Sequence, residues 1–165
     1  MGRTMRARGL TLIELVVALA VLALLATLAL PSFGALVGRH RLVTTAESLA
    51  LDLAEARFQA AQLGSALHVV FRAGDDWCWA VARAPGCDCA PPRQACVIKA
   101  VAAGDNGGVR LSAATDASFG PAGEAVGGRA VLHSADGREE LRVQLTALGR
   151  ARICAVGGLR GYTAC

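Results

Sequence analysis

Several patterns that would indicate an enzyme or a metal site are missing from this chain of 165 residues. No two cysteines have the Cys-x-x-Cys spacing of zinc sites, and His40, His68 and His133 are isolated from one another. Ser134 beside His133 does not make a catalytic triad, and no glycine-rich phosphate loop follows a predicted strand. We therefore expect no catalytic residue, no bound metal and no cofactor.

Acidic side chains are absent from the end of the chain. Residues 141–165 contain no aspartate or glutamate, although the whole chain holds 13 acidic residues and a formal charge of only +4. The segment carries four arginines, which are Arg142, Arg150, Arg152 and Arg160. The positive charge is thus concentrated in the tail, where it suits a polyanionic partner.

Six cysteines all lie beyond the N-terminal apolar run, and an even number in one part of a chain indicates disulfides formed in an oxidising compartment. Cys154 and Cys165 stand apart from the others, and we expect them to pair, which would stabilise the fold by roughly 3 kcal/mol in the chain-entropy model. The other four are expected to pair among themselves in an order that the sequence leaves open: Cys78, Cys87, Cys89 and Cys96. A metal site formed by Cys87-Asp88-Cys89 and Cys96 is the alternative.

A nearly unbroken apolar run at residues 10–30 contains a single acid, Glu14. As a helix the run would be about 31 Å long, close to the roughly 30 Å thickness of a bilayer's hydrocarbon core, so we predict a transmembrane segment. A carboxylate in hydrocarbon costs about 2.5–3.5 kcal/mol on insertion scales and therefore needs a partner. Cleavage between Gly9 and Leu10 would create a cationic amino terminus near Glu14. In an assembly of parallel helices, Glu14 of one subunit could neutralise its neighbour's terminus and set the register.

The N-terminal residues resemble the class III signal of type IV prepilins. They combine a short basic leader with Gly9 at the cut, an apolar Leu10, Thr11, and Glu14 at the fifth mature position. The resemblance implies that prepilin peptidase removes residues 1–9 and that Leu10 is N-methylated. The alternative is a conventional secretory signal or a single-span anchor, and cleavage of such a signal would follow the apolar run near Ala29.

The helical pattern continues beyond Pro31, where a kink is expected, and stops at Gly64. Within residues 31–64 an apolar stripe recurs at steps of three and four residues and should pack on a sheet. It consists of Leu42, Ala46, Leu49, Leu53, Ala56, Ala60 and Leu63. We interpret the charged residues beside it as a solvated face: Glu47, Asp52, Glu55 and Arg57.

Residues 65–153 change to the period of strands, and residues 154–165 form a disulfide-closed tail. Strands are predicted at 67–71, 78–81, 97–101, 109–113, 129–133 and 141–145, with a loop at 119–123. Trp77 and Trp79 share a strand face and are interpreted as core. The predicted class is α+β and pilin-like: a long kinked N-terminal helix, transmembrane in its first half, packed on one or two antiparallel sheets and stabilised by disulfides.

The motif Gly149-Arg150-Ala151-Arg152 has the pattern of a phosphate-binding strand. Two arginines at i and i+2 of an extended strand point to the same side about 7 Å apart, close to the phosphate spacing along one nucleic-acid strand. Gly149 gives the preceding turn freedom, and arginine can bind phosphate bidentately without reading bases. Arg160 and then Arg142 are further candidates. The alternative is that these arginines are simply solvated at a strand edge.

The chain as a whole resembles the GspH/FimT family of minor pilins and pseudopilins, from Gly9 through the long helix to the 119–123 loop and Gly149-Arg150. In FimT-like members a Gly-Arg-x-Arg motif binds DNA in natural transformation, and residues 149–152 match it. The resemblance implies a minor pilin that captures double-stranded DNA independently of sequence. Its partners would be prepilin peptidase and other pilins or pseudopilins. It would sit in the bacterial inner membrane with a periplasmic domain and then in the pilus. The alternative is an H-type pseudopilin at the tip of a type II secretion system, with a structural role and no DNA binding.

Overall fold

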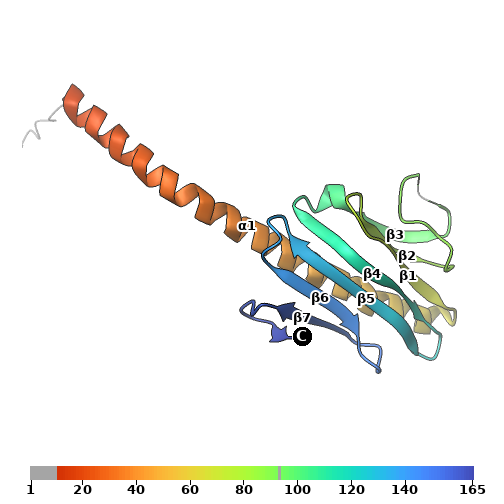
Figure 1. The fold of residues 1–165 in the computed structure, drawn as a ribbon. Helices are drawn as coiled ribbons and strands as arrows, with labels where there is room; N and C mark the ends of the chain where they lie inside the picture. The colour runs from red at the N-terminus through yellow and green to blue at the C-terminus, as the bar shows by residue number, and fades with distance from the viewer. Residues whose placement is uncertain (1–10, 93) are drawn as a thin grey trace, which may run out of the picture. The chain divides into compact units, whose positions relative to one another are not determined.

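A computed structural model describes residues 11–92 and 94–165, and for residues 28–32 it describes the backbone alone. The chain divides into two compact units, Met1–Val37 and Gly38–Cys165. Helix α1 (Leu12–Leu63) begins in the first unit and ends in the second (Figure 1). Helical structure continues through Pro31, so the proline does not end the helix.

The first unit exposes apolar side chains on all sides of its helix. Every side chain described from residue 11 to residue 27 is exposed, including Leu12, Ile13 and Leu15. Among the described residues, no helix combines the length and hydrophobicity needed to cross a membrane. Leu10 and the side chains of residues 28–30 belong to the predicted membrane segment but lie outside the described part. The transmembrane segment at residues 10–30 stays a prediction.

The second unit buries the apolar stripe of α1 almost as predicted. Six stripe positions are at most 1% exposed: Leu42, Ala46, Leu49, Leu53, Ala56 and Ala60. The prediction that Leu63 joins them is wrong, because this side chain is 62% exposed. Leu63 is the last residue of α1, and the chain leaves the helix at Gly64 with a φ of 61°. The stripe therefore ends one turn earlier than its period suggests.

The second unit contains an eight-stranded sheet in the order β3-β2-β1-β4-β5-β6-β7-β8. All neighbouring strands are antiparallel except β7 and β8, which are parallel. A short 3-10 helix, η1 (Ala103–Asp105), precedes β4. The strands are β1 (Leu67–Arg72), β2 (Cys78–Ala82), β3 (Val97–Ala102), β4 (Val109–Phe119), β5 (Ala125–Ser134), β6 (Glu140–Leu145), β7 (Ala151–Val156) and β8 (Thr163–Ala164).

The six predicted strands are confirmed, but β4 and β5 are longer than predicted, and β5 begins at Ala125 rather than at residue 129. β4 continues to Phe119, which was predicted as loop, because this side chain is fully buried in the core. The prediction of an entirely antiparallel sheet is also wrong at one edge. There, Thr163 and Ala164 return alongside Cys154 and Ala155 as a short parallel strand.

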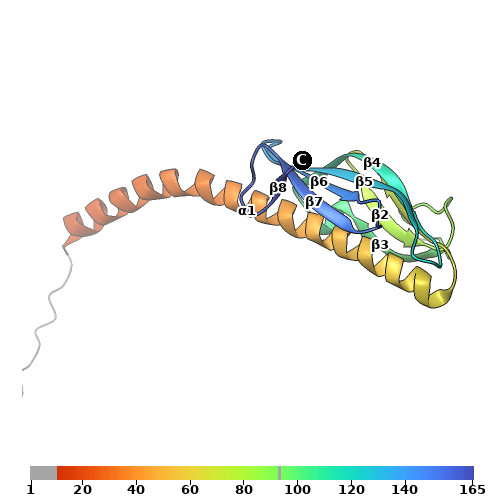
Figure 2. The same cartoon turned by 90° about the horizontal axis from the view of Figure 1, so that it is seen from below.

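The sheet has one face on the helix and another that is only half covered. From Gly38 onward α1 lies along one face (Figure 2), and its stripe forms the main core with the inward residues of the sheet. On the other face, the loop between β2 and β3 covers β1 to β3, where Val70, Cys78, Ala80 and Cys89 form a second cluster. Two disulfides hold this loop, Cys78–Cys89 and Cys87–Cys96.

Asp52 corrects the interpretation of the helix's charged residues as solvated. Its side chain is buried, accepting hydrogen bonds from Trp79 Nε1 at 2.8 Å and from Lys99 Nζ at 2.5 Å. Trp79 stacks on Trp77, with ring centroids 5.4 Å apart, and both indoles lie in the core. An acid beside the stripe can be buried here because an indole N–H and an ammonium group satisfy both of its oxygens.

Candidate functional site

The predicted arginine motif lies where the β6–β7 hairpin turns. Gly149 N donates to Thr146 O at 2.8 Å, and Thr146 N donates to Arg150 O at 2.9 Å. The Thr146 side chain accepts a further hydrogen bond from Arg150 N at 3.2 Å. These bonds close a short turn, so Arg150 is fixed immediately before the first residue of β7.

Gly149 is a packing requirement of this turn. Its φ is 70°, in the left-handed region that glycine tolerates best. A Cβ at this position would lie 2.9 Å from Ala125 Cβ and 3.2 Å from Arg57 Nε. Gly149 is also buried, so its place in the motif is explained by the close approach of the β4–β5 loop and the helix.

Arg150 and Arg152 are both exposed at the open end of β7. Within the described residues neither guanidinium forms an ion pair with a carboxylate. Arg152 Nη2 donates to Thr163 Oγ1 at 3.2 Å, and this neutral hydroxyl leaves the charge uncompensated. The two residues are two positions apart on extended backbone, which separates their Cα atoms by about 7 Å. The arrangement offers two positive groups to one anionic partner.

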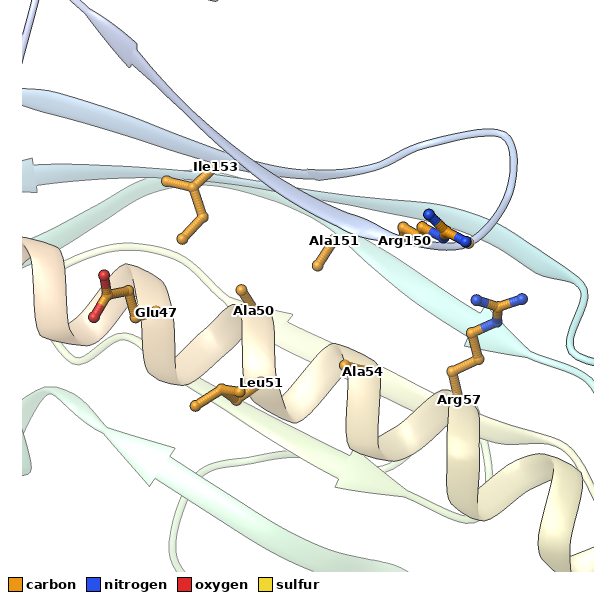
Figure 3. A pocket seen from close by; sticks show the side chains of 9 residues that line it. Glu47, Ala50, Leu51, Ala54, Arg57, Arg150, Ala151 and Ile153 are labelled. Atoms are coloured by element: carbon orange, nitrogen blue, oxygen red, sulfur yellow. The ribbon is translucent and has the colours of Figure 1, made fainter. Parts of the chain in front are cut away.

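A groove runs between α1 and β7 beside Arg150, whereas Arg152 does not line it (Figure 3). It has a volume of about 490 Å³, and Ala50, Ala54, Ala151 and Ile153 contribute to its apolar middle. Arg57 and Arg150 lie at one end and Glu47 at the other (Figure 3). The prediction that Arg57 lies on a solvated face is wrong, because its Nε donates to Gly123 O at 3.1 Å and its side chain packs against Gly149. No pattern in the sequence marks this contact.

Of the two other predicted arginines, Arg142 has its charge paired and Arg160 lies at a distance. Arg142 Nε bonds to Glu140 Oε1 at 2.6 Å, and both side chains are partly buried, so this charge is already neutralised. Arg160 lies beyond the far end of β7, about 20 Å of extended strand from Arg150. It lines a second depression together with Arg39 and Arg138. Arg142 is therefore close to Arg152, level with Cys154 on the next strand, but its charge is paired with Glu140, and Arg160 lies at the other end of β7.

The C-terminal tail is held against the domain at three points. Arg39 Nη2 donates to Arg160 O at 3.1 Å, and a disulfide joins Cys154 to Cys165. The Tyr162 hydroxyl donates to Glu47 Oε1 at 2.7 Å. Partial burial, together with the hydrogen bond and negative charge of Glu47, raises the pKa of Tyr162 to about 12. The tail thus packs beside the groove as well as closing the sheet edge.

At the N-terminal site, Gly9 and Leu10 lie outside the described residues, but Glu14 is described. Glu14 N donates to Thr11 Oγ1 at 3.3 Å, and Thr11 N donates to Glu14 Oε2 at 3.5 Å. This reciprocal pair is a capping box at the start of α1. The Thr-x-x-Glu spacing could have predicted this capping box, but only a charge partner was expected for Glu14.

Two family models match this chain. The model described as type II transport protein GspH matches residues 45–149, more than half of the chain, and ends one residue before Arg150. The model of the prokaryotic N-terminal methylation motif matches residues 4–30. No curated protein and no solved structure matches the chain. The methylation motif implies processing by prepilin peptidase and assembly with other pilins or pseudopilins. With its N-terminal helix packed on a disulfide-stabilised sheet, the chain belongs to the GspH family of minor pilins and pseudopilins.

Proposed function

We propose that this protein is a minor pilin of a type IV pilus that binds extracellular double-stranded DNA for natural transformation. The observation that carries the proposal is the pair Arg150 and Arg152, exposed at one end of β7 and without a carboxylate partner among the described residues. Two guanidinium groups at this spacing can bind successive phosphates, and arginine can hold each phosphate through two hydrogen bonds. Phosphate contacts carry no sequence information, which suits a protein that takes up any DNA.

The proposal also covers the processing, membrane anchoring and assembly of the subunit, which depend on its N-terminal residues. Prepilin peptidase cuts after Gly9, Leu10 becomes N-methylated, and the precursor is anchored in the bacterial inner membrane by residues 10–30 with its domain in the periplasm. In the filament, Glu14 of one subunit neutralises the amino terminus of the next. The methylation-motif match and the exposed apolar side chains of residues 11–27 support this sequence of events.

DNA binding is tested with the full chain in a non-ionic detergent. We expect the Arg150→Ala, Arg152→Ala double variant to bind a fluorescent duplex at least about tenfold more weakly, with a salt slope smaller by about two. A matched control, Arg83→Ala with Arg138→Ala, removes two exposed arginines elsewhere and should bind as the wild type does. Fluorescence anisotropy over a range of salt concentrations measures both quantities. Equal binding by the double variant and the wild type contradicts the proposal.

A second candidate is a minor pseudopilin of a type II secretion system, with a structural role at the tip and no DNA binding. The description of the matched family model favours it, as does the end of that match at Gly149, before either arginine. Under this alternative the double variant and its control behave alike on DNA, while removal of the gene abolishes secretion. Under the DNA-binding proposal the double variant lowers transformation and leaves secretion unchanged.

A further inference from the structure

The open half of the outer sheet face carries a row of polar side chains. The β2–β3 loop covers β1 to β3 on this face, and β5 to β7 lie in full view beside it (Figure 1). Along these strands the burial pattern alternates: Ala130, Leu132 and Val143 face the core, so the residues between them face outward. Arg129 and Arg152 are therefore on the same outer face.

The strand register places Arg129 level with the arginine motif. Arg129 on β5 pairs with Gln144 on β6, and Gln144 pairs with Arg152 on β7. On its other side Arg129 pairs with Thr115 on β4. Because neighbouring strands are about 4.8 Å apart, the Cα atoms of Arg129 and Arg152 are separated by roughly 10 Å. Four strands thus contribute one row of hydrogen-bond donors at right angles to the strands.

The charge of Arg129 is available to a ligand. Its side chain is exposed, and in the described part of the chain it forms no ion pair. The row itself contains no carboxylate, since Gln144 and Thr115 are neutral. Arg142 belongs to the adjacent row, level with Val131 and Cys154, and is paired with Glu140. The sequence alone could not single out Arg129, because only the register brings it level with Arg152.

We propose that this row is a phosphate track and that Arg129 binds a phosphate of the same DNA strand that Arg150 and Arg152 hold. The inference rests on the proposed function. It also gives the path of the bound DNA strand over the sheet, from the open end of β7 across β6 to β5. Arginine side chains several ångströms long can cover the roughly 10 Å between the Cα atoms, which suits a contact one or two phosphates further along. Gln144 lies between Arg129 and Arg152, and its side-chain amide supplies a neutral hydrogen-bond donor to the DNA backbone between their two phosphates.

The test compares Arg129→Gln with Arg129→Lys and with Arg138→Gln, each in the full chain in detergent. Arg138 is an exposed arginine in the turn that follows β5, so Arg138→Gln controls for the loss of one charge. We expect Arg129→Gln to bind duplex DNA about three- to tenfold more weakly, with a salt slope smaller by about one. Arg129→Lys should keep the slope, and Arg138→Gln should match the wild type.

The possible outcomes distinguish the phosphate track from the DNA-binding function on which it rests. If Arg129→Gln binds as the wild type does while the Arg150→Ala, Arg152→Ala variant loses binding, the track is wrong and the DNA-binding function stands. If neither weakens binding, both fail. A fold defect is recognised by far-ultraviolet circular dichroism. If Arg129→Gln has such a defect, Arg129→Lys is the deciding variant. A loss of affinity and of salt slope in Arg129→Lys, with its charge and fold retained, would overturn the proposed phosphate track.

Discussion

Arginines of the helix connect it to the loops of the sheet. Arg41 Nη1 donates to Gly107 O at 2.9 Å, while Arg57 and Arg39 donate to the carbonyls of Gly123 and Arg160. Each of these carbonyls lies in a connection between strands rather than in a strand. A hydrogen bond from an arginine to a backbone carbonyl is worth about 1.5–3 kcal/mol when it is shielded from water. Of these three bonds only that of Arg57 is part-buried, and the other two are exposed. Three arginines of α1 therefore hold three loops of the sheet, and Arg57 does so at the groove.

Tyr162 offers a direct measurement of tail packing because it is the only tyrosine in the chain. Burial and Glu47 raise its pKa from 10.0 to about 12. We expect ultraviolet absorbance to show tyrosinate forming with a midpoint near pH 12 in the folded protein. Glu47→Gln should lower this midpoint only in part, since burial is the larger cause. A midpoint at the ordinary value of 10.0 in the folded wild type would mean that the tail does not pack this way.

The same shift predicts how stability depends on pH. The folded state holds the phenol proton more tightly than the unfolded chain does, so the neutral form is favoured by folding. The stabilisation is fully present below pH 10 and is lost as pH rises toward about 12. Denaturant midpoints measured across this range should fall less steeply in Tyr162→Phe than in the wild type.

At the scale of elements, the β6–β7 hairpin depends on glycine at position 149. We expect Gly149→Ala to lower the free energy of unfolding by about 2–4 kcal/mol, through its positive φ and the overlap with Ala125 and Arg57. Gly137 is a matched control because its φ is 69° and no atom lies within 4 Å of a Cβ there. Gly137→Ala should cost only about 1–2 kcal/mol, from its backbone conformation. Urea unfolding measures both, and equal losses would show that the contacts at Gly149 do not matter.

Elements with a strong local period were predictable, and contacts between distant elements were not. The stripe from Leu42 to Ala60 and the six strands follow from side-chain periodicity, which is set by backbone geometry alone. Asp52 has the same local pattern as the exposed Glu55, and only Trp79 and Lys99 on the facing strands make its burial possible. β8 has two residues and no period to detect. The candidate site divides likewise: Arg150 and Arg152 were visible as a motif, whereas Arg57 and Arg129 join them through packing and register.

For the whole molecule, the apolar side chains of residues 11–27 are all exposed on the helix of the first unit and need a cover from water. In the proposed filament the helices of neighbouring subunits provide that cover. Glu14 is then asked to do two things, to cap its own helix and to neutralise a neighbouring terminus. These roles can be separated, since glutamine serves a capping box as well as glutamate but carries no charge.

We expect Glu14→Gln to assemble poorly although α1 forms normally. The measurement is the amount of the subunit in sheared filaments, by immunoblot, with the cellular amount as reference. Glu55→Gln, which alters an exposed acid of the same helix inside the second unit, should assemble as the wild type does. Assembly of Glu14→Gln at the wild-type level would reduce Glu14 to its capping role. The N-terminal sequence of the recovered subunit should begin at Leu10.

The position of the arginine pair at a hairpin turn has a mechanical consequence. In the proposed pilus, a pull on bound DNA that acts along β7 would load the six pairs that join β7 to β6, from Glu140 and Val156 to Leu145 and Ala151. Tension in that direction shears all of these rungs together instead of opening them one after another. The Cys154 sulfur bridge adds a covalent brace on the same strand. Under such a force, we expect DNA to dissociate from Arg150 and Arg152 before β6 and β7 separate.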